Sequence, residues 1–478
     1  MLQDLNDFST KATEISADIC IIGGGAMGLT LAYALRNTTK KVLIIESGGE
    51  EISPKNQQLL DVEHSGLKVQ FPGSTARIRA LGGSSNCWAG FVMPFSKSVI
   101  DQWPMRAKGM EKYWPKVHDF LMLKGKWQDF YSPKEFLGND FPEEMYSDFN
   151  MEYRQVHPLR IWAHYKDELI KSKNVNIIYN ANATNLELNA DKSKVMRALA
   201  HSLDNNMLTV SANFFVLAAS GIGNSALLLN FDRKLNSALL KDNKIVGKYF
   251  TDHAEIHDRF IPNHCFPTIN YPKEKPPFSP VDFIKPHFRL LDTNGVPKYI
   301  DHSIQFKKSP VNPEIQCSEG LPNFDLHVVT LGFGPTPYEK SEILLSERKN
   351  EIGNFIPSVN WTLEPQDYER LTQLAKEIER IVIKKTIGRI PLSKRFADKQ
   401  LDSVWDYQKE AGIYNGKHWM GGTRMGSDPK TSVVDQNCKL WTSDNLYVTG
   451  ASVFPTFGWP GPTYTALGLA FRLAEHLS

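Results

Sequence analysis

Apolar runs and apolar periodicity along the chain predict an alternation of strands and helices. Residues 19–22 form a short β-branched run that is long enough for one buried strand. A helical pattern follows, with Leu31, Ala32 and Leu35 on one face, and residues 41–45 form a second apolar run that predicts another strand. The chain is therefore expected to begin with a strand, a helix and a second strand.

Further along the chain the pattern of apolar positions changes twice. Residues 175–178 and 183–188 predict two paired strands, and the proline-rich stretch 261–335 contains short runs of alternating apolar and polar residues. This alternation is typical of an antiparallel sheet with one face toward solvent or a ligand. Residues 361–365 end a strand and begin a helix, whose apolar spacing predicts a buried stripe of Leu371, Leu374, Ala375, Ile378, Ile381 and Val382.

A glycine motif lies between the first predicted strand and its helix. Gly23, Gly25 and Gly28 fill the positions of G-x-G-x-x-G, which provide a tight turn, close approach of a pyrophosphate and close packing of helix on strand. The N–H groups at the start of the helix would face the phosphates. The second strand ends on Glu46, 23 residues after Gly23 and close to the ~20 typical of an acid that binds a ribose hydroxyl. These features predict a Rossmann-like dinucleotide site.

Length, charge and cysteine content narrow the class of protein. The chain of 478 residues is too long for one ordinary core and predicts two or three domains. Its net charge is only +2 and its basic residues are dispersed, so no nucleic-acid partner is expected. The five cysteines show no C-x-x-C spacing, which argues against a disulfide framework or zinc knuckle and fits a reducing compartment. Because the N-terminal segment is acidic and the first apolar run is short, we expect a cytoplasmic protein without an integral membrane span.

A second glycine-rich stretch lies at residues 77–90. Two glycines precede Ser84, Ser85 and Asn86, and such a loop can surround a polar ring system with backbone N–H groups and hydroxyls. Taken alone, the same residues also suit an ordinary surface turn.

Together these motifs resemble the glucose–methanol–choline (GMC) family of flavin oxidoreductases. Further matches to the family follow in the same order at residues 215–229, 246–253, 418–426 and 445–472. The resemblance is strongest to bacterial members that act on sugars and other polyols. It implies an α/β fold, α+β overall, in which a Rossmann-like FAD-binding domain is interleaved with a substrate domain built on an antiparallel sheet with helices.

The resemblance also implies domain boundaries and a cofactor. Residues 1–100, 172–260 and 412–478 would form the FAD-binding domain, and residues 101–171 and 261–411 the substrate-binding domain. FAD is favoured over NAD because four separate segments surround the longer cofactor, whereas a nicotinamide enzyme would need only the first crevice. The FAD is expected to be bound non-covalently.

The cofactor-binding residues follow from the same resemblance. The three motif glycines and Glu46 would hold the ADP half, with the backbone of Ala183 beside the adenine. The whole implied set is Gly23, Gly25, Met27, Gly28, Glu46, Gly83, Ser84, Asn86, Cys87, Ala183, Ala219, Ala451 and Thr463.

His418 aligns with the active-site histidine of the family. A histidine titrates near neutrality, so it can take the hydroxyl proton of an alcohol while a hydride is lost. The alternative is a histidine that only caps the Gly421-Gly422 turn. The usual second histidine or asparagine of the family is absent, because Gly461 stands at that position. A water, Tyr464 or a residue of the substrate domain would have to replace it.

Other candidate residues have more than one interpretation. Several relatives carry a histidine in place of Cys87 and some link it to the flavin, but a free thiol is the expected state here. His253 and His257 are spaced as i and i+4, yet the glutamate is misplaced for H-E-x-x-H, so a polar strand face is expected and no metal. His253 itself is expected near the flavin. Four tryptophans could line a sugar site or simply pack in the core, and they are Trp103, Trp114, Trp127 and Trp162.

The leading hypothesis is FAD-dependent oxidation of an alcohol group on a sugar, cyclitol or glycoconjugate. His418 would take the proton and the flavin the hydride. An atypical or non-redox flavin reaction on the same scaffold (lyase, isomerisation or decarboxylation) is the alternative, and a flavin-binding protein without turnover is a third possibility. The sequence leaves open the substrate, the carbon oxidised, the oligomeric state and the electron acceptor, which could be oxygen, a quinone or a protein.

Overall fold

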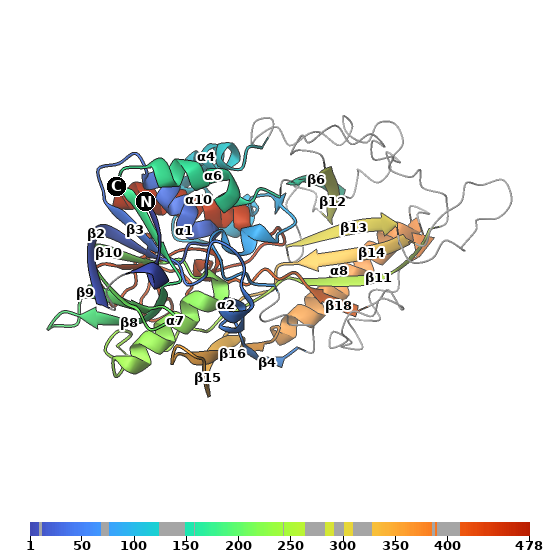
Figure 1. Ribbon diagram of the computed structural model, residues 1–478. Helices are drawn as coiled ribbons and strands as arrows, with labels where there is room; N and C mark the ends of the chain where they lie inside the picture. The colour runs from blue at the N-terminus through green and yellow to red at the C-terminus, as the bar shows by residue number, and fades with distance from the viewer. Residues whose placement is uncertain are drawn as a thin grey trace.

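The computed structural model describes residues 1–8, 12–67, 76–123, 149–156, 158–241, 243–262, 283–290, 301–308, 327–384, 388–389 and 412–478. Within these residues the chain forms two sheets of eight strands and one of three strands, flanked by helices (Figure 1). The α/β fold predicted from the sequence is confirmed.

The first sheet contains both strands predicted near the N-terminus. Its order is β1-β7-β3-β2-β10-β9-β8, and β19 pairs with β10. Neighbours are parallel from β1 to β10, whereas β9 and β8 extend the sheet in antiparallel fashion. The strands are β1 (Leu2–Asp4), β2 (Ala12–Ile22), β3 (Val42–Ile45), β7 (Val175–Tyr179), β8 (Asn182–Leu188), β9 (Val195–His201), β10 (Met207–Leu217) and β19 (Leu446–Val448).

The pairing expected for residues 175–178 with residues 183–188 is wrong. β7 lies between β1 and β3 in the parallel part of the sheet, whereas β8 pairs with β9. Val175, Ile177 and Ile178 are buried, as expected for a strand covered on both faces by other layers. Two neighbouring strand patterns in the sequence therefore belong to different ladders.

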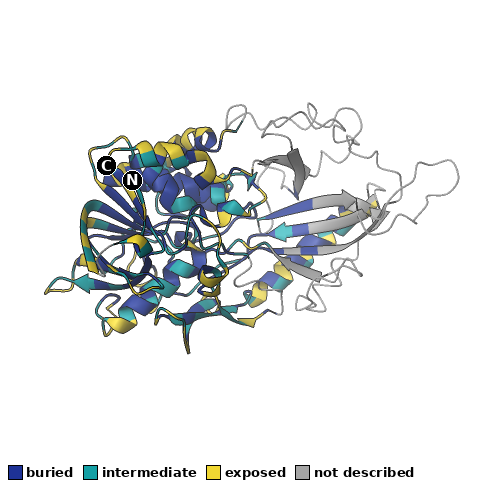
Figure 2. Ribbon diagram, viewed as in Figure 1, coloured by how far each residue is buried: buried dark blue, intermediate teal, exposed yellow. Residues whose placement is uncertain are grey.

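Helices cover both faces of the first sheet (Figure 1). On one face α1 (Ala26–Leu35) packs against α10 (Thr463–Leu477) and α6 (Ile161–Lys171), and α10 also contacts α4 (Trp114–Phe120). α7 (Ser220–Lys234) contacts β8 from the other face. α10 is buried along most of its length (Figure 2), because its residues are apolar almost all round.

The predicted domain boundaries remain a prediction. α4 and α6 lie within residues 101–171, which the sequence assigned to the substrate domain, and both helices pack against helices of the first sheet. Within the described residues, no helix has the length and apolar character needed to cross a membrane.

The second sheet is antiparallel at every pair of neighbouring strands. Its order is β17-β11-β14-β13-β12-β6-β5, and β18 pairs with β11. The strands are β5 (Phe91–Val92), β6 (Phe149–Val156), β11 (Ala254–Pro262), β12 (Phe283–Leu290), β13 (His302–Lys308), β14 (His327–Phe333), β17 (Gly388–Arg389) and β18 (Gly412–Asn415). The antiparallel sheet predicted for the middle of the chain is thereby confirmed.

A third, small sheet has the order β15-β16-β4. Its strands are β4 (Glu63–Gly66), β15 (Glu342–Lys349) and β16 (Phe355–Trp361). The short helices are η1 (Leu5–Asp7), α2 (Pro54–Gln58), η2 (Gly83–Asn86), α3 (Lys97–Ile100), η3 (Ala107–Gly109), η4 (Glu111–Tyr113) and η8 (Ala451–Val453).

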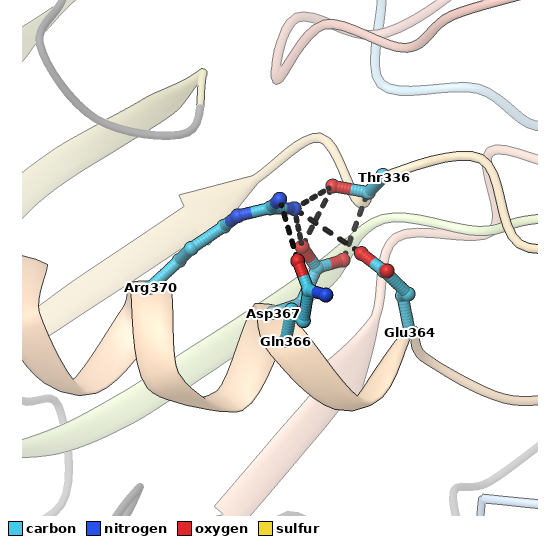
Figure 3. A network of polar contacts seen from close by, with 5 residues as sticks. All are labelled: Thr336, Glu364, Gln366, Asp367 and Arg370. Carbon is cyan, nitrogen blue, oxygen red and sulfur yellow. Dashed lines mark hydrogen bonds and ion pairs between the residues drawn. The ribbon is translucent and has the colours of Figure 1, made fainter.

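The helix predicted after residue 361 is α8 (Pro365–Lys384), and its first turn is held by a network of polar contacts (Figure 3). The buried carboxylate of Asp367 accepts hydrogen bonds from the backbone N–H and the hydroxyl of Thr336, at 2.9 and 2.7 Å. Arg370 donates to Asp367 at 3.0 Å and also contacts Glu364 and Gln366. All members of the predicted buried stripe whose side chains are described are buried, and they are Leu371, Leu374, Ala375, Ile378 and Ile381.

Candidate active site

One cavity of about 720 Å³ lies at the carboxyl ends of β2 and β3. In a parallel sheet, this edge is the usual place for a nucleotide. Most of the residues predicted from the sequence line it, and they are Gly23, Gly25, Met27, Glu46, Gly83, Ser84, Cys87, Ala183, Ala219, Ala451, Thr463 and His418. Segments up to about 440 residues apart in the chain thus meet around one space.

Two of the predicted cofactor-binding residues do not line the cavity. A Cβ at Gly28 would lie 1.9 Å from the carbonyl oxygen of Gly23, so Gly28 allows α1 to pack on the strand. The side chain of Asn86 donates to the carbonyl of Leu81 at 2.8 Å. Both residues therefore stabilise the segments that surround the cavity without lining it themselves.

The glycine motif leaves open space beside the start of α1. Gly23 has a φ of +115°, and a Cβ there would lie 2.6 Å from the carbonyl oxygen of Ala218. At Gly25, in contrast, the nearest atom to a Cβ would be Cα of Gly83, 3.9 Å away. Gly23 is thus required by the fold, whereas the room beside Gly25 is available to a ligand at the helix N-terminus.

Glu46 lies in the same cavity as a buried acid. Its carboxylate accepts hydrogen bonds from the backbone N–H groups of Gly24 at 2.6 Å and Gly48 at 2.7 Å. Burial raises the pKa of Glu46, while these two bonds and the nearby Arg79 act in the opposite direction. The carboxylate keeps further acceptor positions that can bind hydroxyl groups of a ribose.

Two arginines that the sequence analysis did not single out also line the cavity. Burial lowers the pKa of Arg77 to about 9 and that of Arg79 to about 10. The Nε of Arg79 has no hydrogen-bond partner within the part of the chain that the structure describes. Two positively charged side chains, one of them with an unused hydrogen-bond donor, form an environment that fits an anionic ligand such as a pyrophosphate.

A buried asparagine joins two of the predicted cofactor segments. Asn224 is fully buried, and its side-chain oxygen accepts from the backbone N–H of Ala219 at 2.7 Å. Its amide nitrogen donates to the carbonyl of Thr449 and to the hydroxyl of Ser452, both at 2.9 Å. Asn224 therefore holds the start of α7 against η8, which contains Ala451. Sequence reasoning missed it, since an Asn inside a helix gives no signal of long-range contacts.

His418 lies at the cavity as one half of a histidine pair. Its Nδ1 is 2.8 Å from Nδ1 of His253, and the two rings are nearly perpendicular, at 80°. Nε2 of His253 is 2.5 Å from the carbonyl oxygen of Gly458. The fully buried Asp252 accepts the backbone N–H groups of both histidines at 2.7 Å. His253 is thus next to the predicted catalytic residue.

A bulge brings His418 to this position. Ala254 pairs with Asn415, whereas Thr251 forms a bridge with Met420. The segment from Asn415 to Met420 therefore contains two more residues than the segment from Thr251 to Ala254 that lies opposite it. Lys417 adopts a φ of +57° within the bulge. Such bulges commonly redirect a side chain at the rim of a sheet.

Two glycines border the His418 ring. A Cβ at Gly461 would lie 3.4 Å from Nε2 of His418, at ordinary contact distance, and 3.7 Å from the carbonyl oxygen of Phe91. A Cβ at Gly416 would lie only 2.8 Å from Nδ1 of His418 and 2.9 Å from Cβ of His253. Gly416 is therefore needed for the pair to form, whereas Gly461 leaves space in front of Nε2.

The tryptophans predicted from the sequence as possible sugar-site residues do not line the cavity where they are described. Trp103, Trp114 and Trp162 are buried in the hydrophobic core and do not line the cavity, whereas Trp88 and Trp419 do. Trp127 lies outside the described residues. The described residues contain no group of three or more His, Cys, Asp or Glu side chains that could hold a metal ion.

The second sheet is tied to the same region by a buried ion pair. Arg289 and Asp301 are 2.9 Å apart, and Asp301 also accepts the backbone N–H of Trp459 at 2.8 Å. Trp459 follows Gly458, whose carbonyl oxygen contacts His253. The loop that contains Gly461 is thus held between the second sheet and the histidine pair.

Comparison with known families identifies two parts of this fold. Residues 337–470 match the model of the family described as GMC oxidoreductase, and residues 21–51 match that of the NAD(P)-binding Rossmann-like domain. The first match contains His418, Gly461 and Thr463, and the second contains the glycine motif and Glu46.

Curated relatives and solved structures agree with these matches. The chain is 24% identical to paromamine 6'-oxidase of Streptomyces fradiae over 61% of its length and 50% of the relative. It is 22% identical to pyranose 2-oxidase of Lyophyllum shimeji over 73% of its length and 59% of the relative. The chain thus spans between half and three fifths of the length of these curated relatives. The structure of pyridoxine 4-oxidase from Mesorbium loti has a TM-score of 0.67 at 19% identity and covers 96% of this chain and 98% of that chain.

Residues 337–470 thus match the GMC oxidoreductase family, and the fold of the described chain agrees with that match. FAD is the cofactor of this chain, and the cavity fits this group. The space beside Gly25 and the two arginines suit a pyrophosphate, and Glu46 suits a ribose. Ser84, Ala451 and Thr463 line the same cavity together with His418, where the flavin end would be held.

Proposed function

We propose that this protein oxidises an alcohol group of a sugar-like molecule, with FAD as hydride acceptor and His418 as proton acceptor. When bound, FAD supplies the acceptor for the hydride that leaves the carbinol carbon. The chain itself has to hold the alcohol beside His418, remove its proton and keep the reacting group oriented.

The observation that carries this proposal is the position of the His418 ring. It shares one cavity with the predicted cofactor residues, and Nε2 faces the space left by Gly461. A hydroxyl group in that space would be within hydrogen-bond reach of Nε2, which is the geometry that a general base requires. Asp252 accepts the backbone N–H of His418 and Nδ1 of His253 contacts the ring, so both the backbone and the ring of His418 have a polar partner.

A sugar-like substrate is supported by the relatives and by the cavity wall. Paromamine 6'-oxidase, pyranose 2-oxidase and C-glycoside 3-oxidase of Arthrobacter globiformis are named for carbohydrate or aminoglycoside substrates. Trp88 and Phe91 provide aromatic groups in the lining of the cavity that His418 also lines. Aromatic faces beside a few polar groups are a common way to hold a sugar ring.

The test is anaerobic reduction of the bound flavin by a panel of monosaccharides, aminoglycosides, cyclitols and glycosides. Bleaching of the flavin absorbance by one class, with formation of the matching carbonyl product, supports the proposal. A folded, FAD-loaded protein whose flavin stays oxidised with every class contradicts it.

A second candidate is a flavin reaction without net oxidation of the substrate, such as elimination or isomerisation. Gly461 favours it, because the second polar side chain usual in the family is missing beside His418. Product formation while the flavin remains oxidised throughout would favour this candidate over alcohol oxidation.

A further inference from the structure

The hydrogen bonds of His253 determine which of its ring nitrogens carries a proton. Its Nε2 lies 2.5 Å from the carbonyl oxygen of Gly458, and a carbonyl oxygen can only accept. Nε2 of His253 therefore donates. The side chain of His253 is buried, with 3% exposure, an environment in which a neutral ring costs less than a charged one. A neutral ring with a proton on Nε2 has an acceptor at Nδ1.

The tautomer of His418 follows from that of His253. The two Nδ1 atoms are 2.8 Å apart, so one donates and the other accepts. Since Nδ1 of His253 is the acceptor, Nδ1 of His418 is the donor. A neutral His418 then carries its lone pair on Nε2. This atom is 3.4 Å from the position that a Cβ would occupy at Gly461.

We propose that His253 is a positioning residue that holds His418 in the tautomer able to take a proton at Nε2. The O–H bond of the substrate breaks, an N–H bond forms at Nε2, and the resulting positive ring is stabilised because its Nδ1–H still donates to His253. A hydrogen bond from a charged donor is stronger than one from a neutral donor, so the pair favours the protonated state. This catalytic role rests on the proposed function, whereas the tautomer of His418 does not.

Three neighbouring groups allow and maintain the contact between His253 and His418. Gly416 has no side chain, and any Cβ there would collide with both histidines. Asp252 accepts the two backbone N–H groups, which holds the two chain segments at a constant separation. The carbonyl of Gly458 is fixed in turn, because the next N–H, that of Trp459, donates to Asp301.

Two conservative variants of His253 separate its two hydrogen bonds. The amide of His253→Asn reaches about as far as Nδ1, so it can still accept from His418. The longer side chain of His253→Gln reaches about as far as Nε2, so it keeps the bond to Gly458 and loses the acceptor for His418. His476→Gln is the matched control, since His476 is exposed at the end of α10.

The first measurement is ¹⁵N NMR of histidine-labelled, FAD-loaded protein, with the His418 signals assigned by their loss in His418→Gln. We expect a protonated Nδ1 and an unprotonated Nε2 in the wild type, in His253→Asn and in the control, and a mixture of tautomers in His253→Gln. A wild-type His418 protonated on Nε2, or an unchanged His418 in His253→Gln, would overturn the proposal. This readout needs no substrate, so it remains decisive even if alcohol oxidation is not the activity.

The second measurement is the rate constant of flavin reduction by an oxidised alcohol. His253→Gln should lower it by about 10- to 100-fold, by analogy with the loss of the hydrogen-bond partner of a metal-binding histidine, with substrate affinity changed less than about threefold. His253→Asn should recover most of the rate. Equal losses in both variants would indicate packing alone and would contradict a role through the Nδ1 bond.

Discussion

Gly461 stands directly in front of His418: a Cβ at this glycine would lie 3.4 Å from Nε2 and 3.6 Å from Cε1 of the ring. The distance is an ordinary van der Waals contact, and the φ of Gly461 is not in the left-handed region. The backbone therefore allows a side chain at this position, and the space that the side chain would fill is the space in which we place the reacting hydroxyl.

This relationship leads to a prediction for Gly461→Asn. The variant should fold and retain FAD, but its side chain should occupy the substrate position and weaken substrate binding by at least about tenfold, or about 1.4 kcal/mol. The measurement is the substrate concentration dependence of anaerobic flavin reduction. Gly461→Ala is the matched control and should lose much less, because a methyl group fills less of the space. An unchanged or faster reduction in Gly461→Asn would mean that a water normally fills the site.

The second prediction concerns His418. In His418→Ala the cofactor should remain bound, because the glycine motif, Glu46 and the arginines hold it from other segments. Flavin reduction by the substrate should slow by about 10²–10⁴-fold, the usual contribution of a general base. That loss corresponds to about 3–5 kcal/mol of transition-state free energy. Stopped-flow measurement of the reduction rate gives the result, and an unchanged rate would refute the proposed role.

The third prediction separates the glycines of the nucleotide motif. Gly25→Val should fold, since the nearest atom to a Cβ would be 3.9 Å away, but it should lose FAD because the side chain fills the pyrophosphate space. Flavin absorbance of the purified protein and thermal unfolding, compared with wild-type apoprotein, provide the test. Gly28→Val should fail to fold, because its Cβ would lie 1.9 Å from a carbonyl oxygen. Full FAD content in Gly25→Val would show that the pyrophosphate lies elsewhere.

The fourth prediction concerns the thiols. Burial raises the pKa of Cys20 and of Cys438 to about 12, so neither should react with iodoacetamide near neutral pH. Cys87 is exposed to the cavity and should be alkylated in apoprotein and protected by FAD. Peptide mapping by mass spectrometry follows each cysteine separately.

A further experiment on Cys87 tests whether the flavin is bound covalently. Acid precipitation of the holoprotein should release FAD into the supernatant, because we expect no bond to Cys87. Flavin that stays in the pellet of the wild type but not of Cys87→Ser would show that a thioether forms.

The sequence by itself determined the nucleotide half of this protein. The positions of Gly23, Gly28 and Glu46 follow from local requirements: a positive φ, a close contact between helix and strand, and an acid at the end of the next strand. The buried stripe of α8 could be predicted for the same reason, since helical periodicity is a property of neighbouring residues. His418 could be recognised only through the resemblance to a family, because a single histidine has no local pattern.

Only the tertiary structure decided what surrounds His418. His253 lies 165 residues earlier in the sequence, and it reaches His418 because β11 pairs with β18 and a bulge follows between that pairing and the Thr251–Met420 bridge. Arg79 and Asn224 likewise reach the cofactor segments through strand order and loop packing. The sequence placed His253 on a polar strand near the flavin, whereas its direct contact with His418 depends on which strands become neighbours. That choice is made by the packing of the whole chain, because strand neighbours far apart in sequence leave no periodic signal in either segment.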